Sequence, residues 1–141
     1  MPDSSFQLEI ATPERLFVNE QASEAELPGK DGYMGVLPGH APLLSALGAG
    51  VLTYNGSGGE RVLAIAGGFL EVFENHVRVL ADHAEFAQDI NADDARHQLE
   101  EATNALNQAR DTAASENALR AMKKAQARLD ATEKSSGKTQ E

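Results

Sequence analysis

The sequence contains no cysteine. This absence excludes disulfide bonds, thiolate nucleophiles, iron–sulfur clusters and zinc sites with cysteine ligands, and it is compatible with a reducing compartment. Nitrogen ligands are scarce as well, because the chain has four histidines and no two of them have the spacing of metal ligands on one strand face or one helical turn. The sequence therefore predicts no metal site.

A long apolar stretch is also missing. The longest segment without Asp, Glu, Lys or Arg, residues 32–59, is interrupted by Pro38, Pro42 and eight glycines, which a lipid-buried helix would not tolerate. The first five residues, Met-Pro-Asp-Ser-Ser, lack the basic start and apolar core of a secretory signal. We expect a protein that is neither exported nor inserted into a membrane.

Basic residues are few, since 12 Lys and Arg face 22 Asp and Glu and give a net charge of −10. An acidic protein is repelled by phosphate backbones, so nucleic acid is not an expected partner. The charge is uneven: residues 1–88 carry 4 basic and 12 acidic side chains, and residues 89–141 carry 8 and 10. This asymmetry suggests two regions with different roles.

Residues 1–88 have the pattern of an all-β domain. Between Phe6 and Ala81 apolar residues alternate with period two, and turn residues interrupt them every eight to twelve positions. Nine short antiparallel strands follow from this pattern. Asn55-Gly56 and Glu74-Asn75 are expected to form tight hairpin turns, because Asn and Gly accept the positive φ that such turns require.

Residues 89–134 have the composition of helices, with no Gly or Pro and many Ala, Glu, Arg and Gln. Asn91 is the expected N-cap, with Asp93 and Asp94 in the first turn. Apolar positions then recur at alternating spacings of four and three, which predicts two helices packed as an antiparallel hairpin with a break at Asp111–Ser115. The first helix contributes Ala95, Leu99, Ala102, Leu106 and Ala109, and the second contributes Ala118, Met122, Ala125, Leu129 and Thr132.

Half of these seam positions are Ala, and each Ala in place of Leu removes about 2.4 kcal/mol of potential burial at about 0.8 kcal/mol per methylene. A seam this thin suits a hairpin that can detach or open, although the same residues also allow a tight static packing. The polar residues 135–141 are expected to be a disordered tail.

No arrangement of side chains indicates catalysis. There is no Gly-x-Ser-x-Gly elbow and no set of nucleophile, base and orienting residue. Ser136-Gly137-Lys138-Thr139 imitates the end of a phosphate-binding loop, but Thr132 stands where that motif needs its first Gly. A stand-alone hydrolase is therefore disfavoured.

Four segments together resemble the epsilon subunit of bacterial and chloroplast F-type ATP synthases. They are GYMGVLPGHAPLL (Gly32–Leu44), Gly50-Val51-Leu52, AGGFLEV (Ala66–Val72) and VRVLAD (Val77–Asp82), in the order and spacing of that family. The resemblance implies an α+β fold, with an N-terminal ten-stranded antiparallel β-sandwich followed by a C-terminal antiparallel two-helix hairpin. It also implies a non-catalytic subunit of the central rotor stalk.

In this family the sandwich binds the gamma subunit and rests on the ring of c subunits. The resemblance places Asp31, Tyr33 and His40 at that interface. Many members carry an acidic residue at the position of Tyr33, and Asp31 is expected to substitute for it. The expected location is peripheral, on the cytoplasmic face of the bacterial inner membrane, with a plastid thylakoid as the alternative.

The hairpin of bacterial members can extend toward the alpha and beta subunits and block ATP hydrolysis. Four cations on the second helix, Arg120, Lys123, Lys124 and Arg128, correspond to the basic side chains that meet an acidic segment of beta. The alternative for this run is a solvated helix face.

Some members hold the hairpin folded by binding ATP with a motif of the form Ile/Leu-Asp-x-x-Arg-Ala. Asp93 and Arg96 match this motif, but Ala92 and His97 depart from it at its two ends. ATP is thus a possible regulatory ligand, and no other cofactor is expected. The alternative function is a free ATP-binding sensor that forms no complex with gamma, and the alternative for the two residues is a capping Asp beside a surface Arg.

Overall fold

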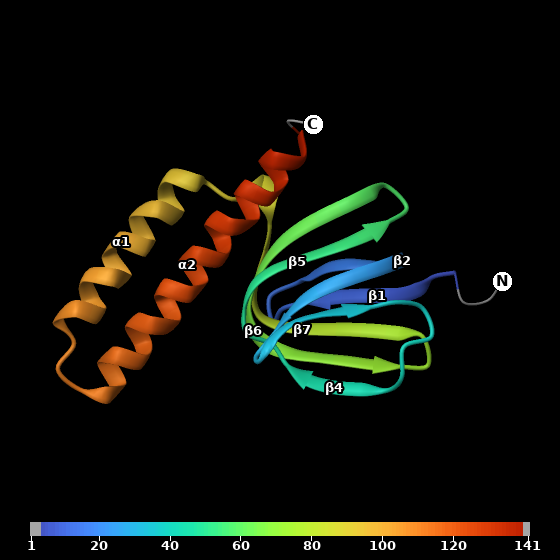
Figure 1. Cartoon of the computed structure of the whole chain (residues 1–141), viewed down its shortest axis with the longest axis horizontal. Helices are drawn as coiled ribbons and strands as arrows, with labels where there is room; N and C mark the ends of the chain where they lie inside the picture. The colour runs from blue at the N-terminus through green and yellow to red at the C-terminus, as the bar shows by residue number, and fades with distance from the viewer. Residues whose placement is uncertain (1–3, 140–141) are drawn as a thin grey trace.

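The computed structural model describes residues 4–139, and the side chains of residues 4–136. Seven strands precede two helices (Figure 1). The strands are β1 (Phe6–Ala11), β2 (Leu16–Gly29), β3 (Gly32–Val36), β4 (Leu43–Ala46), β5 (Ala49–Gly56), β6 (Gly59–Phe73) and β7 (His76–Phe86). A short 3-10 turn, η1 (Ala87–Asp89), leads into α1 (Ala92–Gln108) and α2 (Thr112–Thr139).

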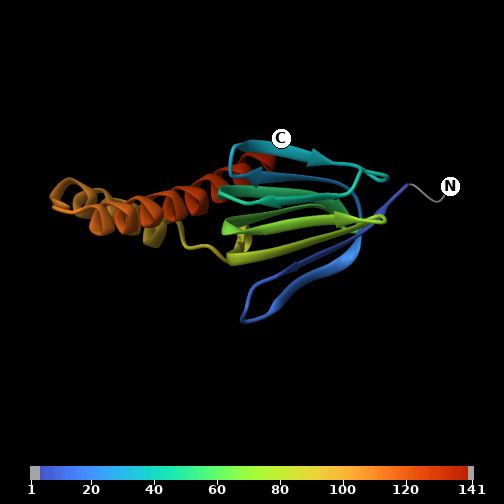
Figure 2. The same ribbon diagram turned by 90° about the horizontal axis from the view of Figure 1, so that it is seen from below.

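The strands form one sheet that closes on itself. Their order is β1-β7-β6-β5-β2-β3, and β1 also pairs with the first half of β2, while β4 pairs with β6. The closed sheet is flattened into two layers, as the turned view shows (Figure 2). The all-β prediction for this half of the chain is therefore confirmed, and the two layers form a sandwich.

The expected ten antiparallel strands are not what the structure contains. The described residues 4–139 form seven strands, and β1 pairs with β7 in parallel. The count is lower because long strands bend without ending, as β6 does at Gly67 and Gly68, which have positive φ values of 74° and 116°. A Cβ on Gly68 would lie 2.1 Å from the carbonyl oxygen of Leu80, so this bend requires glycine.

Alternating side chains of the strands fill the space between the two layers. Phe6, Leu8, Leu52 and Leu63 are among the largest side chains that are fully buried there. Tyr54 is buried too, and its hydroxyl donates a hydrogen bond of 2.7 Å to the Glu20 carboxylate at the rim of the core. This cluster contains no residue of either helix.

Of the predicted turn and cap signals, one turn and the cap are confirmed. The turn predicted at Asn55-Gly56 is wrong, because these residues end β5 and the turn lies at Ser57 and Gly58. Glu74 and Asn75 adopt φ values of 49° and 61° in the β6–β7 turn. The Asn91 side chain accepts a hydrogen bond of 2.9 Å from the Asp94 backbone N–H and caps α1. A β-turn and a helix N-cap each depend on residues that are close together in the sequence, which is why the sequence alone can indicate them.

The two helices form the predicted antiparallel hairpin, with Ala95, Ala102, Ala118 and Ala125 buried in the seam. The break lies earlier than predicted, because Asp111 accepts a hydrogen bond of 2.8 Å from the Ala114 N–H and caps a helix that begins at Thr112. Residues 135–139, the first part of the tail that was expected to be disordered, continue α2. Gln140 and Glu141 lie outside the described residues.

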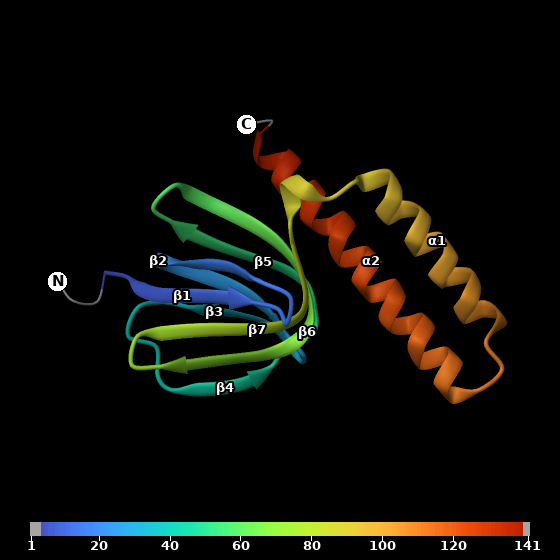
Figure 3. The same ribbon diagram turned by 180° about the vertical axis from the view of Figure 1, so that it is seen from behind.

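The hairpin lies against one side of the sandwich, with α2 between α1 and the sheet (Figures 1 and 3). α2 contacts β5, β6 and η1, whereas α1 packs on α2. The position of α1 therefore depends on α2.

Candidate functional site: the interface between hairpin and sandwich

A small apolar cluster joins α2 to the outer face of β5 and β6. Ala127 and Ala131 of α2 are 2% and 0% exposed, and they pack on Val62 and Ala64. The partly buried side chains of Ala49, Val51 and Ile90 border this cluster. We call it the docking cluster, and it is separate from the core of the sandwich.

Arg128 lies beside the docking cluster and connects three elements. Its guanidinium donates two hydrogen bonds to Glu85 of β7, at 2.9 and 3.2 Å, and one of 2.6 Å to the Gln98 side chain of α1. Asp94 of α1 lies 3.5 Å from the same guanidinium. The Arg128 side chain is 11% exposed. We call this network the Arg128 clasp, and it binds both helices to the last strand.

The hydrogen bonds to Glu85 raise the pKa of Arg128 above the usual arginine value, although partial burial acts in the opposite direction. Arg128 is therefore charged at every physiological pH, and the clasp does not open by its deprotonation. Each of the three guanidinium nitrogens of Arg128 donates a hydrogen bond within the chain while the hairpin is folded. The sequence did not reveal this, because residues 85 and 128 lie on different elements.

The other three predicted cations of α2 have different surroundings. Arg120 donates a hydrogen bond to Asn117, and Lys124 lies 3.4 Å from the Nδ1 atom of His83. Lys123 is exposed. Within residues 4–136, none of these three forms an ion pair with a carboxylate. The structure thus separates Arg128 from the other three members of the predicted set.

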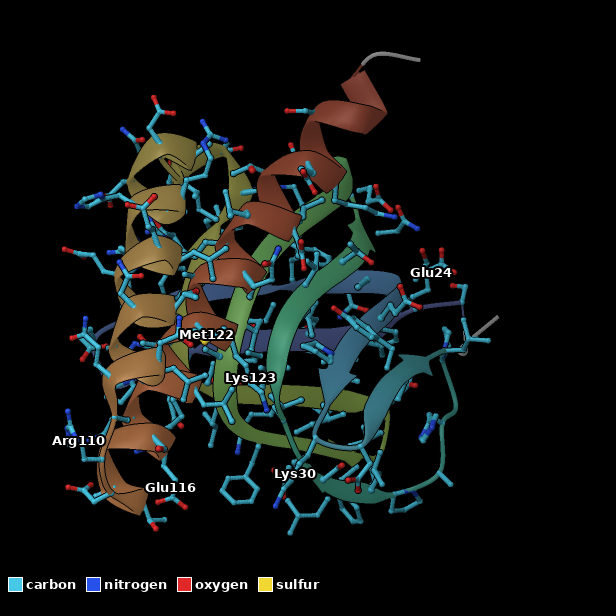
Figure 4. All side chains as sticks on the ribbon, turned by 60° about the vertical axis from the view of Figure 1, so that its left-hand side comes forward. Glu24, Lys30, Arg110, Glu116, Met122 and Lys123 are labelled. Atoms are coloured by element: carbon cyan, nitrogen blue, oxygen red, sulfur yellow. The ribbon has the colours of Figure 1, made fainter. Side chains whose placement is uncertain are left out.

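These three cations line a groove between α2 and the sandwich with a volume of about 910 Å³. Lys30, in the turn between β2 and β3, lines its other side. Figure 4 shows Lys30 on the sandwich and Lys123 on α2, on the same side of the molecule. Phe69 and the bend at Gly67 and Gly68 also contribute to the lining, and Asp82 is the one acidic residue there among the described residues. We call this feature the cationic groove.

The structure does not bring the predicted interface residues together. Asp31 and Tyr33 lie where β2 turns into β3, and the Tyr33 hydroxyl accepts a hydrogen bond of 2.8 Å from the Val51 N–H. His40 follows the other end of β3, in a corner held to the β6–β7 turn by a hydrogen bond of 2.9 Å from the Gly39 N–H to Asn75. Asp31 and His40 are therefore at opposite ends of the sandwich.

Exposed apolar side chains gather on the outer face of β4, β6 and β7. Phe69 and Leu80 are directly opposite each other on neighbouring strands and are 57% and 52% exposed. Leu44 and Phe73, on the same strands, are 73% and 55% exposed. We call these four residues the outer apolar face. Large apolar side chains exposed as a group are typical of a surface that binds another protein.

Asp93 and Arg96 pair with each other on α1, and their side chains are 90% and 61% exposed. The neighbouring Asp94, expected from the sequence only as an acidic residue of the first turn, is the one that reaches Arg128.

Within the described residues no group of His, Asp and Glu has the geometry of a metal site. None of the helices in the described part of the chain is long and apolar enough to cross a membrane.

Comparison with known proteins identifies similar sequences and folds. Residues 5–87 match the family model of the ATP synthase delta/epsilon chain, beta-sandwich domain. An ATP synthase epsilon chain of Solibacter usitatus is 51% identical over 135 residues, which cover 95% of this chain and 99% of that protein. An ATP synthase epsilon chain of Nitratidesulfovibrio vulgaris is 41% identical over 127 residues, covering 90% and 95%.

Two solved structures share the fold. A chain of the Euglena gracilis mitochondrial ATP synthase, in an assembly of OSCP, F1 and c-ring, has a TM-score of 0.75 at 24% identity, covering 85% of this chain and 76% of that chain. A chain of the Tetrahymena thermophila mitochondrial ATP synthase, in its central stalk and c-ring, has a TM-score of 0.62 at 19% identity, covering 89% and 95%.

Proposed function

The chain belongs to the ATP synthase delta/epsilon family, and we propose that it joins the gamma subunit to the c ring and that its hairpin restrains ATP hydrolysis. The chain is an epsilon subunit of the F1 sector, with a stalk and regulatory role and no catalytic one. As an F1 subunit it is peripheral to the membrane. We place it on the cytoplasmic face of the bacterial inner membrane.

The proposal of two partners is supported by two separate surfaces of the sandwich. The turn with Asp31 and Tyr33 lies at one end, and the corner with His40 lies at the other. We assign the Asp31 end to the c ring, and we assign His40 with the outer apolar face to gamma. Apolar side chains such as Phe69, at 57% exposure, then become buried when the complex forms.

The inhibitory role of the hairpin rests on how it is attached. The docking cluster and the Arg128 clasp are separate from the core of the sandwich, so the hairpin can leave without unfolding the strands. This is the observation that carries the proposal. Release frees Arg128 to join Arg120, Lys123 and Lys124 as a basic surface for an acidic segment of the beta subunit.

ATP binding by Asp93 and Arg96 remains a prediction. A nucleotide would have to compete with the pairing of these two residues. The phosphates of ATP would compete for Arg96, because a guanidinium binds phosphate in two-pronged hydrogen bonds.

The proposal is tested with a complex of alpha, beta and gamma subunits that hydrolyses ATP. The full chain is compared with a version ending at Ile90, which keeps every strand and removes both helices. We expect both to bind gamma and only the full chain to slow hydrolysis. If both bind and neither inhibits, the inhibitory role is wrong; if neither binds gamma, the coupling role is wrong.

A further inference from the structure

The cationic groove contains a concentration of positive charge that the rest of this acidic chain does not match. Lys30, Arg120, Lys123 and Lys124 line it, and within residues 4–136 none of them forms an ion pair with a carboxylate. Elsewhere in the described chain, Arg78, Arg96 and Arg128 are paired with acidic side chains, and Arg15 and Arg61 lie over the rings of Phe17 and Phe86. Asp82 is the one acidic residue in this lining among the described residues, so four cations face a single carboxylate in a chain with a net charge of −10, and this excess favours an acidic ligand.

The wall of the groove is apolar. Ala46, Leu47, Ala121 and Phe69 contribute to it, together with the backbone at Gly67 and Gly68. Phe69 is also part of the outer apolar face, where it stands opposite Leu80. The groove therefore continues into an exposed apolar surface, and a ligand that matches both must combine carboxylates with apolar side chains.

The cations come from two separate parts of the molecule. Lys30 lies in a turn of the sandwich, whereas the other three lie on one stretch of α2. Arg120 and Lys124 are also turned toward Asn117 and His83. A ligand that meets cations on both walls and the apolar residues between them has to be extended, as a segment of protein chain is.

We propose that the cationic groove, with the hairpin folded, binds an acidic segment of a neighbouring subunit whose apolar side chain packs on Phe69. This inference rests on the proposed function, because it requires neighbouring subunits. It differs from the inhibitory contact in using Lys30 together with the cations of α2. The two contacts exclude each other, because Lys30 and α2 separate when the hairpin opens.

Such a segment would also stabilise the folded hairpin, since it bridges the sandwich and α2. Partner binding and hairpin folding are then linked, so that each favours the other by the same factor. The occupied groove would keep Lys123 and Lys124 from the acidic segment of beta.

The absence of cysteine in the natural sequence allows a specific test. Ala121 lines the groove without contributing charge, so Ala121→Cys carries a benzophenone maleimide in the assembled ATP synthase. Arg110→Cys, at the exposed tip of the hairpin, is the matched control (Figure 4). Illumination and mass spectrometry identify the attached peptide. We expect Ala121→Cys, and not Arg110→Cys, to capture a segment of another subunit with at least two carboxylates and an apolar residue.

Charge dependence completes the test. The crosslinking yield of Ala121→Cys should fall about tenfold when Lys30→Gln and Lys123→Gln are added, as expected for the loss of two charge-assisted contacts. Arg110→Gln should leave it unchanged. Crosslinks only within this chain, or to a segment without carboxylates, overturn the inference. Retention of the labelled Ala121→Cys chain in the assembly reports separately on the proposed function, since a chain that is retained but captures no acidic segment contradicts this inference alone.

A small anion is the competing occupant. Amide NMR spectra of the full chain are recorded during titration with sodium tripolyphosphate. Saturable shifts at Gly67, Gly68 and Lys123 that disappear in the Lys30→Gln, Lys123→Gln variant would assign the groove to a small anion and overturn the inference. We expect only weak shifts that do not saturate.

Discussion

The interior of the sandwich and its contact with the hairpin are built from different side chains. Tyr54, Phe6 and several Leu and Ile residues fill the interior, whereas Ala127 and Ala131 are the buried residues that α2 contributes to the docking cluster. A Leu buries about three methylenes more than an Ala, or about 2.4 kcal/mol at about 0.8 kcal/mol each. The difference indicates that the sandwich stays folded, whereas the hairpin can detach from it.

The two regions also differ in their polar contacts. Within residues 4–136 no polar or charged residue is buried in the sandwich core. The hairpin is oriented by the Arg128 clasp, whose acidic members Glu85 and Asp94 are 35% and 57% exposed. Apolar burial does not fix direction, whereas the paired hydrogen bonds of a guanidinium do. The clasp therefore specifies where a weakly held hairpin docks.

The largest effect should come from the sandwich. Leu63 is fully buried, so Leu63→Ala should lower the free energy of unfolding by about 2–5 kcal/mol. Urea denaturation followed by circular dichroism measures it. Leu119→Ala, at a residue that is 41% exposed, is the control and should change stability little. An equal loss of unfolding free energy in both variants would contradict the conclusion that the interior of the sandwich holds the fold together.

A second change should affect the attachment and spare the sandwich. Ala131 is 0% exposed against the sheet, and Ala131→Leu overpacks this contact by about 1–3 kcal/mol. Hydrogen exchange should become faster in α1 and α2 and stay slow in β6 and β7. The exposed Ala113 provides the control, Ala113→Leu. Faster exchange in the strands would show that the two regions are not independent.

The clasp should contribute less. Arg128→Gln should weaken docking by about 1–2 kcal/mol, given the partial exposure of Glu85. Because the pKa of Arg128 is raised, its contribution is complete below the usual arginine pKa and is lost only as pH rises through the raised value. Hydrogen exchange of α2 in this variant, compared with Arg96→Gln at an exposed pair, measures the effect. Equal effects of the two substitutions would remove the special role of the clasp.

The smallest effect concerns the rim of the sandwich. Burial, followed by the hydrogen bond to Glu20, raises the pKa of Tyr54 above its usual value near 10. The folded state thus holds the phenol proton more tightly, so this stabilisation is complete below about pH 10 and is lost above it. Between about pH 10 and 11 the free energy of unfolding should fall by up to about 1 kcal/mol more in the wild type than in Tyr54→Phe. Parallel alkaline curves in thermal melts would refute this.

The sequence predicted the features that arise from neighbouring residues. Period two in the first 88 residues, the Asn91 cap and the seam through Ala95 and Ala118 all have local signals. The thirteen residues from Gly32 to Leu44, with three other segments, were sufficient for the family resemblance. These signals determine the fold class and the pairing of the two helices.

Features that depend on contacts between distant residues were missed. Ala127 and Ala131 lie outside the seam, and their spacing of four was no stronger a signal than that of any other Ala in a helix of this composition. The pairing of Arg128 with Glu85 joins residues 43 positions apart. The parallel pairing of β1 with β7 likewise depends on the closure of the sheet. Periodicity describes which face of an element is apolar and does not describe what covers that face.

The length of α2 determines how far the hairpin can extend from the sandwich. Its 28 residues correspond to a rod of about 42 Å at about 1.5 Å per residue. The link at residues 87–91, where η1 leads into α1, is the one covalent connection between this rod and the strands. A swing about that link would move the far tip by tens of ångströms. The subunit could then act on a partner that the sandwich itself never touches.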